Sequence, residues 1–225
     1  MSPVPHGTRR RLIRTLGTAA AALLGSVCLS AVAAPAASAA SCAAVDVSVA
    51  RGTFEPGTLG LFLGDGMYSA LQSALAPRTL SSYAVKYPAD LIEPASVHQG
   101  NTDLVNHVTS QAAACPQQRF VLVGYSQGAN VVDNSLGISS DGAIVGGSIV
   151  ATIPAAIGPR VAAVLLFGNP IRAIGRSVTG TYQSRTKDYC ADGDPVCQQG
   201  GTNVLAHLSY GNNTADAAAF AAGKF

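Results

Sequence analysis

A serine between two glycines is the residue best suited to chemistry in this 225-residue chain. Ser126 is the centre of a G-x-S-x-G pattern formed with Gly124 and Gly128, after an apolar run and before a helix-compatible segment. A tight strand-to-helix turn of this kind exposes the serine hydroxyl, and the helix start adds partial positive charge where an oxyanion forms. The pattern also occurs by chance in Gly- and Ser-rich turns. Its flanking strand and helix favour a nucleophile elbow.

A serine nucleophile of this type needs a base and an acid, which follow it in the order acid, then histidine. His207 is the only histidine after Ser126, so we expect it to be the base. No glutamate occurs after Glu93, so the acid must be an aspartate. The aspartates between Ser126 and His207 are Asp133, Asp141, Asp188, Asp192 and Asp194. Asp133 falls within the helix after the elbow, where it is expected to face away from the site.

The cysteines narrow the choice of acid. After the first forty residues an even set remains, Cys42, Cys115, Cys190 and Cys197, which in an exported chain predicts two disulfides. The short separation favours Cys190–Cys197 and leaves Cys42–Cys115, and the absence of a C-x2-C pair argues against zinc. Asp192 and Asp194 lie inside the short loop, where a disulfide would hold a carboxylate in place. The spacing does not separate these two.

Strands and helices alternate along the rest of the chain. Apolar runs that end at Gly, Asn or Pro predict strands buried on both faces, and the segments between them are compatible with helices. The predicted strands are 45–50, 120–123 and 161–167, and the predicted helices are 67–75, 103–114 and 127–136. This alternation predicts an α/β domain with a mainly parallel sheet covered on both faces, and a site beyond the carboxyl ends of its strands. Residues 137–158 fit either a surface loop or a flap near the site.

The first 39 residues have the composition of a signal peptide. Four arginines in residues 9–14 precede an Ala- and Leu-rich stretch that ends in Ala37-Ser38-Ala39. We expect cleavage rather than a retained membrane anchor, by either ordinary secretion or the twin-arginine route. Removing these four of the 14 Lys and Arg leaves 10 against 12 Asp and Glu, a net charge of −2. Residues 40–225 therefore have no basic surplus for nucleic acid or anionic lipid, and they suit one domain.

Four motifs in this order resemble those of the cutinases: residues 50–56 (ARGTFEP), 124–129 (GYSQGA), 193–197 (GDPVC) and 207–210 (HLSY). The resemblance spans nearly all of residues 40–225 and is similar in character to the actinobacterial cutinase-like esterases. It implies a compact α/β-hydrolase fold and matches Asp194 to the acid and the four cysteines to two disulfides. It also implies oxyanion donors at Thr53 and at the backbone N–H of Gln127.

The expected function is that of a secreted serine esterase without metal or cofactor, acting on acyl esters, lipids or polyesters. An acetylxylan-type polysaccharide esterase is the alternative within this chemistry. A non-catalytic secreted binding protein is the rival from another class. His98, Asp103 and His107 lack the H-E-x-x-H spacing of a metal hydrolase. The chain has only two glutamates, Glu55 and Glu93, which argues against a glycosidase, although pairs of aspartates stay open. We expect a monomer that binds an ester substrate, with no nucleic acid and no stable membrane anchor after signal removal.

Overall fold

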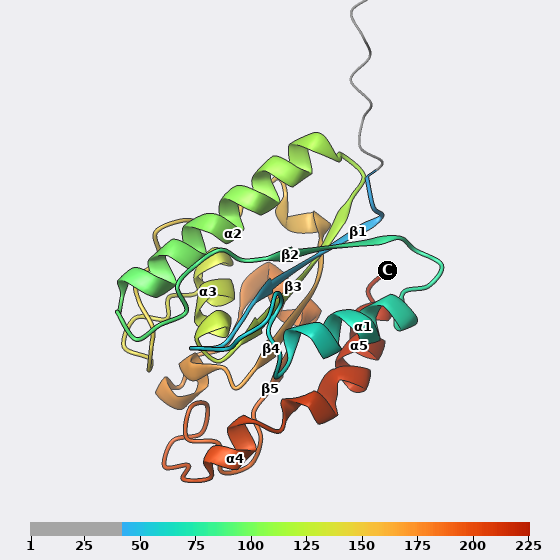
Figure 1. The fold of residues 1–225 in the computed structure, drawn as a ribbon. Coiled ribbons are helices and arrows are strands. Elements are labelled where there is room, and N and C mark those ends of the chain that lie inside the picture. The colour runs from blue at the N-terminus through green and yellow to red at the C-terminus, as the bar shows by residue number, and fades with distance from the viewer. Residues whose placement is uncertain (1–41) are drawn as a thin grey trace, which may run out of the picture. The chain divides into compact units, whose positions relative to one another are not determined.

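A single sheet of five parallel strands organises the structure, a computed structural model that describes residues 42–225 (Figure 1). The expected signal peptide, residues 1–39, lies outside the described residues. The strands have the spatial order β2-β1-β3-β4-β5. Their bounds are β1 Val45–Ala50, β2 Leu80–Ala84, β3 Arg119–Tyr125, β4 Val161–Phe167 and β5 Thr186–Tyr189. The parallel sheet confirms the predicted α/β fold class.

The three central strands are the ones that the apolar runs predicted. Strands β1 and β4 are buried along their whole length, and β3 is buried after its first residue, because helices cover both faces of the sheet. The two edge strands, β2 and β5, are only partly buried and carry polar residues. Their short mixed sequences, LSSYA and TKDY, gave no apolar run from which to predict a strand.

Two pairs of helices cover the two faces of the sheet (Figure 1). Helices α2 (Ala95–Ala114) and α3 (Gln127–Ser135) pack over one apolar core, and helices α1 (Gly64–Ala74) and α5 (Thr214–Ala222) pack over the other. A short helix, α4 (Val204–His207), follows β5 and precedes α5. The Ala-rich tail therefore forms the last helix of the domain. Within residues 42–225, no helix has both the length and the apolar character needed to span a membrane.

Two disulfides fasten the fold, and they are the pairs that the spacing favoured. Cys42–Cys115 joins the segment before β1 to the end of α2, with 5.7 Å between the Cα atoms. Cys190–Cys197 closes the loop directly after β5, with 5.8 Å between the Cα atoms. The second disulfide thus lies at the carboxyl end of the sheet, the edge at which parallel sheets bind ligands.

Candidate active site

Ser126 lies at a sharp turn between β3 and α3, with a φ of +55°. Positive φ is uncommon outside glycine and tends to occur at functional sites. Two glycines make the turn possible: a Cβ on Gly128 would lie 1.9 Å from the Ala50 carbonyl oxygen, and one on Gly124 would lie 2.6 Å from the Gly128 oxygen. The Ser126 N–H donates to the Phe167 carbonyl at 2.9 Å, which fixes the turn against β4. The local geometry is therefore that of a nucleophile elbow.

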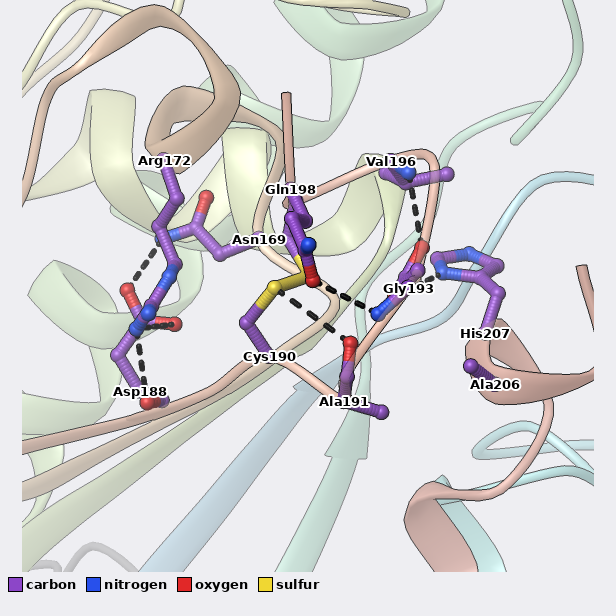
Figure 2. Close-up of a disulfide and its surroundings, with 12 residues drawn as sticks. Asn169, Arg172, Asp188, Cys190, Ala191, Gly193, Val196, Gln198, Ala206 and His207 are labelled. Carbon is purple, nitrogen blue, oxygen red and sulfur yellow. Dashed lines mark hydrogen bonds and ion pairs between the residues drawn. A yellow bond between two sulfur atoms is a disulfide. The ribbon is translucent and has the colours of Figure 1, made fainter. Parts of the chain in front are cut away.

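His207 and Asp194 are in direct contact at the carboxyl end of the sheet. His207 Nδ1 lies 2.8 Å from Asp194 Oδ2, and the carboxylate is completely buried. Asp194 also accepts the Val196 N–H at 2.8 Å and the Tyr210 hydroxyl at 2.5 Å. Figure 2 shows the His207 ring facing the loop that carries Gly193 and Val196. The carboxylate is thus held by three groups.

The Cys190–Cys197 loop decides between the two aspartates that the spacing left open. Asp194 points inward from this loop to His207, whereas Asp192 is exposed. Between these two aspartates, the Gly193 N–H donates to Gln198 Oε1 at 2.7 Å. The structure therefore brings Asp194, and not Asp192, to the imidazole.

The His207 ring fits between two aromatic residues and the end of β4. The Tyr125 ring stacks on it with 5.1 Å between centroids, and the Tyr125 hydroxyl donates to the His207 carbonyl at 2.8 Å. Tyr210 meets the imidazole edge to face. Gly168 has a φ of +56°, and a Cβ there would lie 2.7 Å from His207 Cε1. Only glycine leaves the ring this space.

Ser126, His207 and Thr53 line one open cavity of about 280 Å³. The other side chains in its wall are mostly apolar: Phe62, Leu91, Tyr125, Ile144, Val145, Val196 and Leu208. Within the described residues, no hydrogen bond joins Ser126 to His207. Catalytic hydrogen bonds in unliganded enzymes are often long and shorten when substrate binds. The cavity thus brings the predicted nucleophile and base together at one surface.

The loop that carries Thr53 is organised by a buried glutamate. Glu55 Oε2 accepts the Gly52 N–H at 2.7 Å, and its Oε1 accepts the N–H groups of Phe62 and Leu63 at 2.7 and 3.1 Å. Burial raises the pKa of Glu55, and the three N–H donors act in the opposite direction. This glutamate therefore has a structural partner for each oxygen, and it positions the backbone around Thr53.

Gln127 starts helix α3, and its side chain is completely buried. Its Nε2 donates to the Asp90 carbonyl and to Glu93 Oε1, both at 2.6 Å, and its Oε1 accepts the Ser96 hydroxyl at 2.8 Å. These contacts tie the elbow to the loop before α2 and to the first turn of that helix. Burial is the main cause that raises the pKa of Glu93 to about 7. Sequence reasoning weighed Glu93 only as a glycosidase carboxylate and missed this contact, for which no motif gives a signal.

The residues considered for a metal site have separate partners. His98 Nε2 lies 3.2 Å from the Ser148 hydroxyl, and His107 Nε2 lies 3.0 Å from the buried Asp46. Asp103 accepts the Tyr83 hydroxyl. Each of the three is therefore engaged in a different contact.

Sequence comparisons identify relatives of this site. The family model described as Cutinase matches residues 41–225. A cutinase of Kineococcus radiotolerans is 44% identical over 191 residues, which are 82% of this chain and 63% of that protein. The carboxylesterase Culp1 of Mycobacterium tuberculosis is 36% identical over 228 residues, 96% of this chain and 97% of that protein. The chain thus spans less than two thirds of the Kineococcus protein and nearly all of the mycobacterial one.

Solved structures give the same fold. A Trichoderma reesei cutinase in complex with a phosphonate inhibitor matches with a TM-score of 0.67 at 34% identity, over 81% of this chain and 77% of that one. An acetylxylan esterase matches with a TM-score of 0.68 at 25% identity, over 82% of this chain and 99% of that one.

Proposed function

Because the chain belongs to the cutinase family, we propose that it hydrolyses carboxylic esters with Ser126 as nucleophile, His207 as base and Asp194 as acid. One observation carries the proposal: a buried carboxylate lies 2.8 Å from the imidazole Nδ1, and that imidazole shares a cavity with a serine at a nucleophile elbow. The names of the relatives, cutinase and carboxylesterase, agree with this chemistry.

In the proposed reaction, His207 takes the Ser126 proton while the serine oxygen attacks the ester carbonyl. The protonated imidazole is stabilised by Asp194, and it then gives the proton to the departing alcohol. Water repeats the sequence on the acyl-enzyme and releases the acid. Only a neutral imidazole has a free nitrogen lone pair, so His207 acts as base in its neutral form.

Two groups are proposed to hold the negative oxygen that forms in both steps. The Gln127 N–H lies at the start of α3, where the helix leaves backbone donors free. The Thr53 hydroxyl and N–H are offered by the loop that Glu55 fastens. Removal of one such donor typically costs about 10²–10³ in kcat.

The proposed substrates are esters with an apolar part: acyl esters, lipids or polyesters. Large apolar side chains around the cavity are 48% to 62% exposed, namely those of Phe62, Leu91, Ile144 and Leu208. Exposed apolar patches of this kind mark sites that bind other apolar matter. The fold similarity to an acetylxylan esterase supports polysaccharide acetate as the second candidate.

A fluorophosphonate probe tests the chemistry directly, because it labels only an activated serine. Labelling and p-nitrophenyl ester turnover should both disappear in Ser126→Ala while the fold is retained. A labelled Ser126→Ala variant would show that another serine reacts. Turnover of a polyester film compared with acetylated xylan then separates the two substrate classes. If the unchanged protein shows no labelling and no turnover, that result favours the non-catalytic binding protein.

We also propose that the protein is secreted after cleavage of residues 1–39 and acts as a monomer without nucleic acid or a membrane anchor. The basic start, the apolar stretch and the Ala-x-Ala end support export. Replacing Arg9, Arg10 and Arg11 by Lys should block export if the twin-arginine route is used. Unchanged secretion would favour the ordinary route.

A further inference from the structure

The segment 138–153, which follows α3, forms part of the wall of the site. It contains no helix or strand, and its Ile144 and Val145 line the cavity that holds Ser126. The sequence pattern left this region open between a loop and a flap. Its contacts show how it is held.

Three buried asparagines fasten the segment to the helices beneath it. Asn130 Nδ2 donates to the carbonyls of Ile144 and Val145 at 3.0 and 2.9 Å. Asn134 in the next turn of α3 binds the backbone of Ser140, Gly147 and Ser148, and Asn101 of α2 binds that of Val150 and Ala151. All three side chains are completely buried. The segment is therefore attached along its length by the helix that begins at the nucleophile and by its neighbour.

The turn at the cavity is strained. Val145 has a φ of +46°, a conformation that is a clear outlier for a β-branched residue. Such strain persists where the surroundings fix the backbone, and it tends to occur at functional sites. Here the surroundings are the two hydrogen bonds from Asn130, which lies one helical turn beyond Gln127. Asn130 thus connects the position of this wall to the elbow.

The cavity has two opposite sides, here called its banks, and they belong to different faces of the sheet. His207, Val196 and Leu208 come from the segments after β5, and the His207 ring packs against Tyr125 and Tyr210, which belong to the α1 and α5 core. Ile144 and Val145 lie over α3, and Gly147 packs near Val97 and Pro94 at the start of α2. His207 must protonate the departing alcohol, so the alcohol part of an ester belongs on its bank. The acyl chain is left with the other bank.

We propose that Ile144 and Val145 form the acyl-side wall of the site and that Asn130 is a positioning residue that sets its place. This inference rests on the proposed esterase function. It assigns the limit on acyl-chain length to a segment outside the triad and the oxyanion donors. The substrate class that this wall selects is a linear aliphatic acyl ester.

Opposite changes in the size of Ile144 test the wall. The readout is the ratio of kcat/KM for p-nitrophenyl laurate to that for p-nitrophenyl butyrate. Ile144→Ala should raise this ratio and Ile144→Trp should lower it, each by about threefold or more. A threefold change is smaller than the effect that one methylene group has on kcat/KM in an enclosed pocket. Ile174→Ala and Ile174→Trp are matched controls, because Ile174 is exposed in a short helix that does not line the cavity.

Asn130→Ala tests the positioning role. Release of the two carbonyls should move the ratio, whereas a purely structural loss would lower both rates equally. A series of butyrate esters of increasing alcohol length should keep its profile in the Ile144 variants. If the alcohol profile moves and the acyl profile does not, or if neither moves, the inference is overturned. Absence of any ester turnover in the unchanged protein would instead overturn the proposed function.

Discussion

At the scale of single residues, the proposed acid depends on a tyrosine that no motif argument singled out. Tyr210 is buried, and its hydroxyl donates to Asp194 while it accepts the Ala191 N–H at 3.0 Å. Sequence order could indicate a serine, an acid and a histidine because their roles fix that order. A residue that holds the acid has no such rule. Tyr210 was visible in the sequence only as the last residue of the HLSY motif.

We predict that Tyr210→Phe lowers kcat/KM for a p-nitrophenyl ester about tenfold, equivalent to about 1.4 kcal/mol. The carboxylate loses one of its donors and holds the imidazole less firmly. The variant also leaves the Ala191 N–H without its partner, so the rates must be measured on protein shown to be folded. Tyr189→Phe is the control, because Tyr189 makes a similar bond to the exposed Asp216. Equal losses in both variants would contradict a special role for Tyr210.

Glu93 gives a second prediction, in stability against pH. A carboxyl whose pKa is raised in the folded state supports folding fully below its unfolded pKa and loses that contribution as the pH rises through the folded value. For Glu93 this window runs from about 4.5 to about 7. Glu93→Gln keeps an acceptor for Gln127 and removes the titration. The unfolding free energy of Glu93→Gln minus that of the unchanged protein should therefore increase as the pH rises through this window.

Chemical denaturation at the two ends of the window measures the effect. Asp141→Asn, at an exposed position, is the control and should show no such gain. An equal difference at both ends for Glu93→Gln would contradict the prediction.

At the scale of elements, α3 combines several tasks that its sequence pattern did not reveal. The pattern predicted a helix over residues 127–136, and the structure has α3 from Gln127 to Ser135, buried throughout. That helix supplies a proposed oxyanion donor and fastens the acyl-side wall through Asn130. Its polar residues are buried by different segments: Asn130 and Asn134 bind the segment 138–153, whereas Gln127 binds the residues around the start of α2. A pattern of polar positions does not predict which segments will cover them. The partly polar edge strands β2 and β5 escaped notice for a related reason: burial on one face weakens the apolar signal.

Asp133 in α3 leads to a prediction about this element. Its side chain is completely buried, and within residues 42–225 neither oxygen accepts a hydrogen bond of good geometry, although the Asn169 side chain is close enough to oppose the rise in pKa. Burial, and then the nearby Asp188 carboxyl, raise the pKa of Asp133 well above its usual value. Ionisation is thus unfavourable in the fold, and stability is lost as the pH rises through that pKa. Asp133→Asn should be more stable than the unchanged protein at neutral pH, with a smaller difference in acid.

Denaturant midpoints measured from acid to neutral pH check this result. Asp188 Oδ1 is buried without a hydrogen bond and has an ion pair with Arg172 at 3.6 Å, so it can still accept a bond from the new amide. The quantity compared is the stability of Asp133→Asn minus that of the unchanged protein. If this difference is smaller at neutral pH than in acid, the pKa argument is contradicted.

At the scale of the whole molecule, the sheet gathers residues that are far apart in the chain. Thr53 follows β1, Ser126 follows β3, and Asp194 and His207 follow β5, so parallel strands bring their carboxyl ends to one edge. The alternation of strands and helices predicted this meeting place. It could not predict which aspartate of the small loop turns inward, since that depends on backbone geometry within the loop.

The two disulfides should therefore differ in effect. Cys42–Cys115 spans 73 residues of sequence, and its removal as a Cys→Ala pair should cost about 4 kcal/mol of stability in the chain-entropy account. Cys190–Cys197 spans 7 residues, and its removal should cost about 2–3 kcal/mol. The Cys190–Cys197 loop carries Asp194, so removal of this disulfide should lower kcat more than removal of Cys42–Cys115. Denaturation and ester kinetics on both pairs, compared in conditions where each is folded, decide the matter.

Gly168 limits how this scaffold can vary. Its backbone conformation and its contact with the His207 ring act together, so even a single methyl group there would push the imidazole out of register with Asp194. In a library randomised at this codon and selected for ester cleavage, the surviving clones should nearly all encode glycine. Randomising Gly175, which also has positive φ but has open space around it, should return several residue types. The His207 ring therefore determines which residues can be tolerated at the end of β4.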